Sequence, residues 1–311
     1  MQQKWLVIIN PVSGGKAAPK RWAKIQPILE AAGIGMQVAY TEYRDHGAKL
    51  ASEAVKQGFR HILILGGDGT ANDVVNGVMQ SGIAPQEMVL AMIPAGTGND
   101  WVRTIGKPQT TTEIVSALQN IKTQLHDVGI ARYTQGEEKR ERYFINIAGL
   151  GFEGAVAQYL FEHSGKFYFG KLQYQLAIMR TLFRYKHTRM RITTDQGQDD
   201  LTVLSVAVGN GKYNGGGLKQ LPSANFNDGQ LDMTIITTMP KWKMVVSLPK
   251  LQSGAHVHMR EVQTFKSKSI TIHSDPPVSI DADGEYIGST PLELAIAPQQ
   301  IQVLVWTKLM M

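Results

Sequence analysis

The sequence contains no cysteine, and this absence excludes several kinds of chemistry. Without thiols the protein forms no disulfide and no zinc–thiolate site, and it has no cysteine nucleophile. Such a composition is typical of the reducing interior of the cell. We therefore expect a cytoplasmic protein, for which peripheral contact with the inner face of the membrane stays open.

Long apolar runs are also missing. The N-terminal run covers only Trp5–Ile9 before Asn10 and Pro11, which is too short for the core of a signal peptide. No other run approaches the ~20 residues that a membrane-spanning helix needs. We therefore expect a soluble protein, and the sequence shows neither internal repeats nor low-complexity segments.

Two common phosphate-binding motifs are absent as well. A P-loop places Lys-Ser or Lys-Thr after its last glycine, whereas Gly69 is followed here by Thr70 and Ala71. The dinucleotide pattern G-x-G-x-x-G also fails, because Asn72 stands where the last glycine is required. A different glycine-rich segment, Gly66–Thr70, therefore has to be interpreted from its surroundings.

The segment Gly66–Thr70 lies between two patterns of different period. His61–Leu65 is a short apolar run rich in strand formers, and Ala71–Met79 carries valines at helical spacing. Thr70 is expected to cap this helix, with Asp73 as its capping-box partner. The free N–H groups and the positive dipole end of such a helix favour phosphate. A plain connection between a strand and a helix is the alternative.

The length of 311 residues, with 43% hydrophobic residues, is sufficient for two packed domains. In the first third, strand patterns alternate with helical patterns, which indicates a parallel sheet flanked by helices. The expected strands are Trp5–Ile9, Met36–Tyr40, His61–Leu65 and Met88–Ile93, and the expected helices are Lys20–Ala32, Ala48–Lys56, Ala71–Met79 and Thr111–Ile121.

Beyond about residue 122 the patterns change to those of a mostly antiparallel β domain with inserted helices. The expected strands are His126–Tyr133, Tyr143–Ala148, Met190–Thr194, Val203–Val208, Leu231–Thr237, Ser269–His273, Val278–Asp281 and Leu292–Ile296, and the expected helices are Glu153–Phe161, Lys171–Phe183 and Trp242–Gly254. Ile301–Trp306 is expected to return to the first domain. We thus predict an α/β domain at residues 1–124, joined by 298–311, and a β-sandwich domain at 125–297.

Three expected strands of the first domain end in similar loops, Asn10–Gly15, Gly66–Thr70 and Pro94–Asp100. The carboxyl ends of parallel strands lie at one edge of the sheet, where ligands bind. Three such loops together predict a triphosphate site, with Asp68 and Asp100 facing or holding magnesium. For Asn99 and Asp100, a cap on the helix Trp101–Ile105 is the alternative.

Two acidic motifs follow in the second domain. Asn225–Asp232 has closely spaced oxygen ligands around a glycine turn, which suits a hard cation; a plain Asp-Gly turn is the alternative. In Asp283-Gly284-Glu285 the two carboxylates are expected to point the same way, toward the phosphate edge. A carboxylate there could take a proton from an attacking hydroxyl. The alternative for Asp283-Gly284 is a hairpin turn.

The net charge of +6 is unevenly distributed. No acidic residue occurs from Ser164 to Thr194, where seven lysines and arginines are interleaved with aromatic and aliphatic residues. A helix with one core face and one solvated face explains this pattern, and a surface that docks on anionic lipid is the alternative. No known nucleic-acid-binding motif accompanies the charge.

Together these motifs resemble the bacterial diacylglycerol kinase family, and the resemblance covers nearly the whole chain. The glycine–aspartate core is shared with NAD kinases and phosphofructokinases, whereas the later motifs are those of the lipid kinases. The matching segments are Asn10–Gly14, Gly66–Gly77, Pro94–Asp100, Asp127–Gly129, Asn146–Phe152, Gly209–Gly211, Gly215–Gly217, Asp228–Asp232 and Asp283–Glu285.

The resemblance implies a phosphofructokinase-type nucleotide domain and a β-sandwich that carries the lipid site. It also implies ATP, magnesium, transfer of phosphate to a lipid hydroxyl such as that of diacylglycerol, and a role in phospholipid synthesis. Glu285 matches the general base, with Asp283 and Asp68 as further catalytic residues. Asp68, Asp100 and Asp127 match a catalytic magnesium network. The remaining matches are a structural magnesium site at Asn225, Asp228 and Gln230, and nucleotide contacts at Asn10, Pro11, Val12, Ser13, Gly14, Thr41, Gly66, Gly67, Asp68, Gly69, Thr70, Ala71, Asn72, Asp73 and Thr97.

Two other functions stay open at this stage. A kinase for a soluble substrate such as NAD would use the same glycine loops, and a non-catalytic nucleotide-binding regulator would bind ATP without turnover. The motif Asp283–Glu285 favours the lipid kinase over the first, and the full set of carboxylates favours an enzyme over the second. The sequence does not identify the lipid that is phosphorylated, and it leaves open whether the protein forms a homodimer.

Overall fold

The computed structural model describes residues 4–163 and 171–306, and for residues 171–177 only the backbone. The chain divides into two compact units. One unit contains the residues up to Val128 and those from Ala297 onward, and the other contains Gly129–Ile296. Two strands, β5 (Thr123–Gln135) and β14 (Glu285–Leu304), carry the chain from one unit into the other.

The first unit is built on a sheet in the order β14–β4–β3–β1–β2, in which every pairing is parallel. Its strands are short apolar runs, as expected for a sheet that is covered on both faces. Beyond Ala297, β14 pairs with β4 through Gln302 and Val303. The other strands are β1 (Lys4–Ile9), β2 (Gly35–Tyr40), β3 (His61–Gly66) and β4 (Val89–Pro94).

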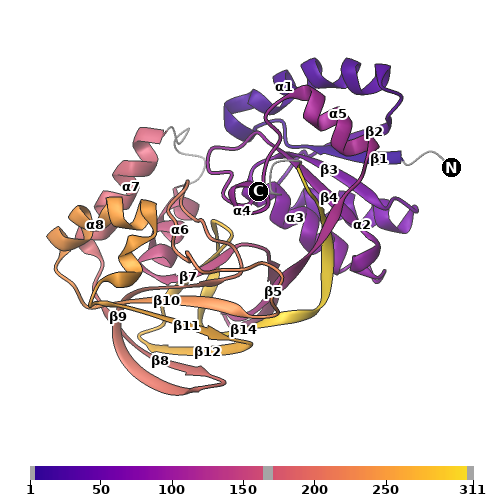
Figure 1. Cartoon of the computed structure of the whole chain (residues 1–311). Coiled ribbons are helices and arrows are strands. Elements are labelled where there is room, and N and C mark those ends of the chain that lie inside the picture. The colour runs from indigo at the N-terminus through magenta and orange to yellow at the C-terminus, as the bar shows by residue number, and fades with distance from the viewer. Residues whose placement is uncertain (1–3, 164–170, 307–311) are drawn as a thin grey trace. The chain divides into compact units, whose positions relative to one another are not determined.

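Helices cover both faces of this sheet (Figure 1). On one face, Trp22 and Leu29 of α1 and Leu118 of α5 pack against alternate strand residues such as Val7 and Leu63. On the other face lie α2 and α3, which contact each other. The helices are α1 (Ser13–Ala31), α2 (His46–Lys56), α3 (Asp68–Met79), α4 (Trp101–Ile105) and α5 (Thr111–Gln119), with a 3-10 turn at Pro85–Glu87.

The ends of two helices differ from the sequence expectation. Helix α1 begins with a kink, because Gly14–Lys16 have left-handed φ angles, and its regular right-handed turns start after Lys16 rather than at Lys20. Helix α5 begins at Thr111, as expected, but ends at Gln119 rather than at Ile121. Before its first residue, Oγ1 of Thr110 accepts a hydrogen bond from the backbone N–H of Glu113. This N-cap satisfies one of the amides that a helix start leaves unpaired.

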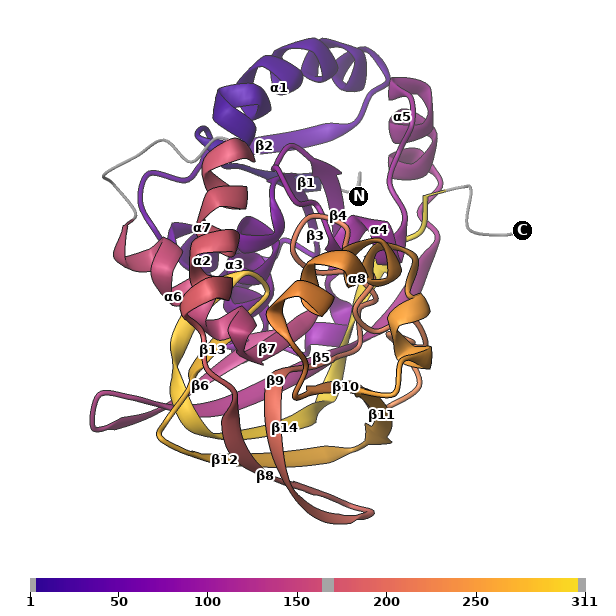
Figure 2. The same cartoon turned by 90° about the vertical axis from the view of Figure 1, so that its left-hand side faces the viewer.

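The second unit is antiparallel throughout its described pairings (Figure 2). Strands β7, β13, β14, β12, β8 and β9 pair in turn, and β9 pairs again with β7, so these strands form a closed circuit. Strands β10 and β11 continue from β9. Alternate residues of these strands, among them Val206 and Ile280, form one buried core.

The elements of this unit surround that core. The strands are β6 (Glu138–Phe144), β7 (Ile147–Gly151), β8 (Thr188–Thr194), β9 (Gly197–Gly209), β10 (Leu231–Thr237), β11 (Val262–Ser267), β12 (Ser269–Asp275) and β13 (Ser279–Ala282). The helices are α6 (Phe152–Glu162), α7 (Lys171–Arg184) and α8 (Lys241–Ser253), with a 3-10 turn at Ala255–His258.

Two strand predictions for this unit were wrong. The expected strand Tyr143–Ala148 is divided into the ends of β6 and β7, because the chain turns at Ile145 and Asn146. The segment Val262–Ser267, for which no strand was expected, is β11 and pairs with β10. None of the helices in residues 4–163 and 171–306 has the length and apolar character required to cross a membrane.

Candidate active site

The three glycine loops of the first unit pack against one another through their backbones. A Cβ atom added to Gly14 would lie 2.0 Å from the carbonyl oxygen of Ala95, and one added to Gly96 would lie 2.5 Å from the Cα of Gly67. Only glycine permits such close approach. The loops after β1, β3 and β4 therefore form one continuous backbone surface at the carboxyl edge of the sheet, where ligands of such sheets bind.

The side chain of Asn10 fixes the first loop. Its Oδ1 accepts a hydrogen bond from the N–H of Val12 at 3.1 Å, and its Nδ2 donates to Oγ1 of Thr70 at 3.1 Å. The first loop is thereby connected to the start of α3. Val12, held by this contact, is 64% exposed, so its apolar side chain is available to a ligand.

Helix α3 begins at Asp68, with Gly67 as its N-cap, and no side chain caps it. The prediction that Thr70 caps this helix was therefore wrong. Gly67 adopts the extended conformation of an N-cap residue, so the helix starts before Thr70, which is buried inside the first turn. The consequence is favourable for an anion, because no side-chain cap competes for the first N–H groups of α3.

Asp68 and Asp100 come together beside Gly98. A Cβ atom at Gly98 would lie 3.0 Å from Oδ2 of Asp68 and 3.3 Å from Oδ2 of Asp100. Oδ1 of Asp68 accepts a hydrogen bond from the backbone N–H of Trp101 at 3.0 Å. Asp100 is buried, and its Oδ1 forms an ion pair with Nε of Arg103 at 3.4 Å. Two carboxylates side by side supply the oxygen ligands that magnesium prefers.

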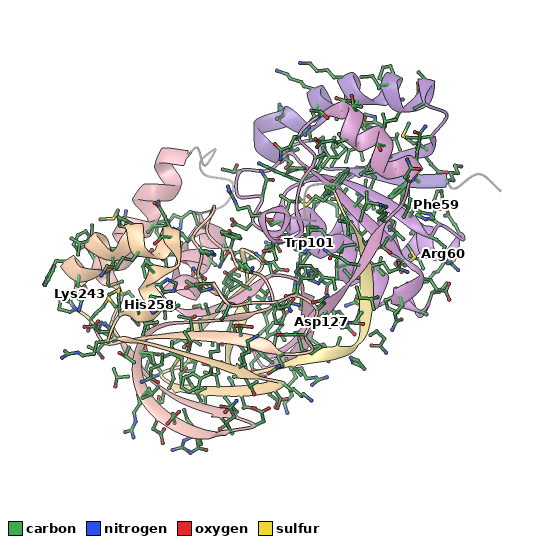
Figure 3. The ribbon with its side chains drawn as sticks, in the orientation of Figure 1. Phe59, Arg60, Trp101, Asp127, Lys243 and His258 are labelled. Carbon is green, nitrogen blue, oxygen red and sulfur yellow. The ribbon has the colours of Figure 1, made fainter. Side chains whose placement is uncertain are left out.

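The side chain of Trp101 connects this pair to Asp127 (Figure 3). Its Nε1 donates to Nε2 of His126 at 3.1 Å, so Nδ1 of His126 carries the proton and donates to the carbonyl oxygen of Asp127 at 2.6 Å. Burial lowers the pKa of His126 to about 4, so the ring is neutral at pH 7. Oδ1 of Asp127 accepts from Nε2 of Gln300 at 2.7 Å.

The remaining residues that were predicted to contact the nucleotide lie on several elements. Thr97 is exposed on the third loop. Thr41 is buried after β2, and its N–H bonds to Ile9. Asn72 is fully buried and accepts from Nδ2 of Asn76, and Asp73 packs against Gly47 of α2. Within α3, the residues nearest the loops are therefore Asp68 to Thr70.

In the second unit, Asp283 and Gly284 form a two-residue hairpin turn between β13 and β14. Both have positive φ angles, of 50° and 88°, and Ala282 pairs with Glu285 across the turn. Positive φ at both turn residues is the geometry that suits the twist of an antiparallel hairpin. The hairpin alternative is thus present in the structure, and it places Glu285 at the first position of β14.

The carboxylate of Asp283 serves the backbone. Its Oδ2 accepts from the N–H of Ile145 at 2.9 Å, and its Oδ1 accepts from the N–H groups of Asn146 and Ile147 at 2.9 and 3.1 Å. Asp283 is only 5% exposed. These three charge-assisted bonds hold the turn that divides the expected strand Tyr143–Ala148, which indicates a positioning role for Asp283.

Glu285 is accessible and forms an ion pair. Its Oε2 lies 3.2 Å from Nη2 of Arg142, and the exposed fractions of the two side chains are 25% and 18%. Arg142 comes from β6, so the ion pair connects the start of β14 to β6. Sequence reasoning missed Arg142, because nothing in the local pattern of β6 separates it from the exposed charges of the same strand.

A second pair of carboxyl groups lies inside this unit. Oε1 of Glu153 accepts from Oγ of Ser205 at 2.9 Å, and Oδ2 of Asp281 accepts from Nδ2 of Asn214 at 3.3 Å. Burial raises the pKa of Glu153 to about 7. Burial, together with the charge of Glu153, raises the pKa of Asp281 well above its ordinary value. The pair therefore favours holding a proton.

A lysine of β11 pairs with the loop that was predicted to bind a structural cation. Nζ of Lys266 lies 2.8 Å from Oδ2 of Asp228 and 3.3 Å from Oδ2 of Asp232. The hydrogen bond to Asp228 raises the pKa of Lys266. Oδ1 of Asp228 accepts from the N–H of Gln230, and Oδ1 of Asn225 accepts from that of Asn227. In this arrangement the ammonium group supplies the positive charge, so the metal at this loop stays a prediction.

Several residues of these sites were not expected from the sequence: His126, Gln300, Arg142, Glu153 and Lys266. Each acts on a partner that is distant in the sequence or carried by another element, and none belongs to a recognisable motif. Within the described part of the chain, no group of three or more His, Cys, Asp or Glu side chains has the arrangement of a metal site.

Two models of known protein families match the chain, each over a different part of it. Residues 4–133 match the model of the diacylglycerol kinase catalytic domain. Residues 146–305 match that of the YegS C-terminal NAD kinase beta sandwich-like domain. These matches cover the glycine loops and the hairpin of Glu285, respectively.

Similar proteins span the whole chain. A diacylglycerol kinase of Mycobacterium tuberculosis is 30% identical over 304 residues, covering 97% of this chain and 94% of that protein. A diacylglycerol kinase of Bacillus subtilis is 28% identical over 302 residues, covering 96% and 95%. The crystal structure of a candidate diacylglycerol kinase from Bacillus anthracis str. Sterne superimposes with a TM-score of 0.76 at 27% identity, covering 97% of both chains. Yeast NADH kinase, with a TM-score of 0.56 at 11% identity, covering 99% of this chain and 84% of that one, shares the fold.

Proposed function

Because the chain belongs to the diacylglycerol kinase family of lipid kinases, we propose that it transfers the γ-phosphate of ATP to the hydroxyl group of a lipid. Diacylglycerol, which would give phosphatidate, is the first substrate to test. The observation that carries the proposal is the contact of the three glycine loops around Asp68 and Asp100. A multiply charged phosphate chain suits this surface of backbone N–H groups.

The residues of the first unit bind and orient the nucleotide in this proposal. The uncapped N–H groups at the start of α3 and the loop backbone at Ser13 and Gly14 hold the phosphates, and exposed Val12 contacts an apolar part of the nucleotide. Asp68 and Asp100 fit magnesium, since their oxygens lie side by side at Gly98. When bound, magnesium would offset negative charge on the phosphates.

Glu285 is the proposed base. It accepts the proton of the lipid hydroxyl as the oxygen attacks the γ-phosphorus, the bond from that phosphorus to its bridging oxygen breaks, and ADP leaves. Arg142 holds the carboxylate of Glu285 in one direction. Asp283 positions Glu285, because its bonds to the N–H groups of Ile145–Ile147 anchor the hairpin turn that precedes β14. Positioning and electrostatic stabilisation provide most of the rate gain in phosphoryl transfer, so the second unit needs to contribute little more than this base and the lipid site.

The test is incubation with labelled ATP and a total lipid extract, followed by identification of the labelled lipid. Glu285→Gln should lower turnover by about 100- to 10,000-fold, the usual contribution of a general base, with ATP binding retained. Glu293→Gln, an exposed position on the same strand, is the matched control. Full activity of Glu285→Gln would show that Glu285 is not the base.

The same assay separates the other two functions. Labelled NAD or sugar phosphate, with no labelled lipid, would identify a kinase for a soluble substrate. ATP binding without any labelled product would identify a regulator. Asp68→Asn, which keeps an oxygen for the N–H of Trp101, should abolish lipid labelling if Asp68 positions magnesium and phosphate.

A further inference from the structure

One surface of the second unit exposes large apolar side chains. Trp242 and Val246 are 68% and 62% exposed and lie one helical turn apart on α8, and Phe183 near the end of α7 is 61% exposed. None of the residues of α8, all of which the structure describes, is buried. Water-exposed apolar surface is unfavourable, so a group of such residues indicates a binding surface.

These side chains belong to adjoining elements. Nζ of Lys241, next to Trp242, donates a hydrogen bond to the carbonyl oxygen of Phe183. The N–H of Met239 donates to Nε2 of His187 at 3.4 Å. The end of α7 and the start of α8 therefore meet, and Figure 3 labels Lys243 and His258 in the same region. We call Phe183, Arg184, Lys186, Trp242, Val246 and Lys250 the α7–α8 surface.

The charge around this surface has one sign. From Met233 to Arg260 the sequence contains four lysines and arginines and no acidic residue. Arg184, Lys186 and Lys250 are exposed, and among the described residues none forms an ion pair with them. Lys243 is the exception, because it bonds to Glu261. These cations thus lie on or beside the same two elements that carry the exposed aromatic side chains.

This combination selects one kind of partner. A second copy of the chain would bring the same cations against each other across a two-fold axis, which is unfavourable. Tryptophan prefers the interface between water and lipid. Lysine and arginine side chains near an anionic leaflet are attracted to it, and apolar insertion adds to that attraction.

We propose that the α7–α8 surface docks on the headgroup region of an anionic lipid bilayer. The proposal rests on the lipid kinase function for its biological purpose, which is to bring the enzyme to its substrate. The vesicle-binding test does not depend on that function. It differs from the sequence expectation, which placed docking between Lys166 and Arg191. Residues 166–170 of that stretch lie outside the described residues, and the surface extends to α8, which the expectation did not include.

Tryptophan fluorescence gives a direct measurement. The other four tryptophans are at most 2% exposed, so quenching by brominated lipid reports on Trp242. On vesicles of phosphatidylcholine with phosphatidylglycerol, we expect quenching and a blue shift, both reduced by salt. On phosphatidylcholine alone, we expect neither. Sedimentation without quenching of Trp242, or equal binding to both vesicles, would overturn the proposal.

Variants test the surface itself. Trp242→Ala should weaken binding to anionic vesicles about tenfold or more, and the pair Lys186→Gln and Lys250→Gln should remove most of its salt dependence. Ile28→Ser, an exposed apolar position on α1, and Lys139→Gln on β6 are the matched controls and should bind as the wild type does. Wild-type binding by Trp242→Ala, or a dimer of the wild type that Trp242→Ala dissociates, would contradict docking.

The lipid kinase function can be disproved independently of the docking surface. In detergent micelles, where no bilayer is needed, Trp242→Ala should phosphorylate lipid at the wild-type rate, with the loss confined to vesicle substrate. If the wild type phosphorylates no lipid and yet quenches on anionic vesicles through Trp242, the enzyme proposal falls and the docking surface stands. Equal activity of Trp242→Ala on vesicles and on micelles would instead count against the surface.

Discussion

In the first unit, Asp68 accepts one backbone hydrogen bond, from Trp101, and its second oxygen has no hydrogen-bond partner among the described residues. In the second unit, Asp283 accepts three backbone hydrogen bonds and is almost fully buried. Both follow a strand and both stand beside a glycine. This difference shows that a motif identifies where a carboxylate lies. The hydrogen bonds that the carboxylate accepts decide whether it is available to a ligand or stabilises the fold.

Among the changes in the first unit, Gly14→Ala is expected to have the largest effect. The new Cβ would lie 2.0 Å from the carbonyl oxygen of Ala95, and a backbone atom cannot move away cheaply. We expect nucleotide binding to be lost and the free energy of unfolding to fall by more than about 4 kcal/mol. Calorimetric titration with ATP and thermal unfolding measure the two effects.

Gly33→Ala is the matched control for this change. Gly33 also has a positive φ angle, of 72°, but a Cβ there meets nothing within 4 Å. It should therefore show only the backbone strain, about 1 kcal/mol. Equal losses in the two variants would show that strain, rather than contact between the loops, explains the requirement for glycine.

Asp283→Asn tests the second region. The amide group would place a donor against a backbone N–H that now has an acceptor, so we expect the free energy of unfolding to fall by about 3 kcal/mol. Hydrogen exchange at Ile145 and Ile147 should accelerate as well. Asp199→Asn, at an exposed position of β9, is the control. Unchanged exchange would mean that the turn does not depend on this carboxylate.

The buried pair in the second unit predicts a dependence of stability on pH. Folding raises the pKa of Glu153 to about 7, so the folded protein keeps a proton that the unfolded chain releases near pH 4. The contribution of Glu153 to stability should therefore be largest below about pH 4 and decrease by about 3 kcal/mol as the pH rises to 7. Glu153→Gln should flatten this part of a urea-unfolding profile. A slope identical to that of the wild type would place the titration elsewhere.

The smallest expected effect returns to the first region. Trp101→Phe removes the N–H that bonds Nε2 of His126 and leaves that nitrogen without this partner. The expected loss is about 1 kcal/mol. A double-mutant cycle with His126→Phe should give a coupling energy of similar size, and strictly additive losses would show that the bond contributes nothing.

The sequence patterns predicted the first region better than the second. Alternation of apolar runs and helical patterns is local, so the strands at Trp5 and His61 were readable, and glycines after each strand indicated where the loops meet. The wrong cap at Thr70 reflects a local ambiguity, because Asp68 and Gly69 are as compatible with a first helical turn as with a loop.

The second region depends on partners that are distant in the sequence. The strand expected at Tyr143–Ala148 turns because Asp283 binds its amides, and the ion pair of Glu285 depends on Arg142. Likewise, Lys266 of β11 forms an ion pair with Asp228 of the acidic loop. No local period or motif records such contacts, so only the folded chain reveals which carboxylates are already engaged.

Strand β14 also has a consequence for synthesis on the ribosome. Strand β4 is translated early, but its parallel neighbour, the end of β14, emerges only after the whole second unit. During that interval one edge of the nascent sheet is open, and an open edge can pair with other chains. We therefore expect nascent chains stalled before Ala297 to associate with chaperones more than chains released after Trp306.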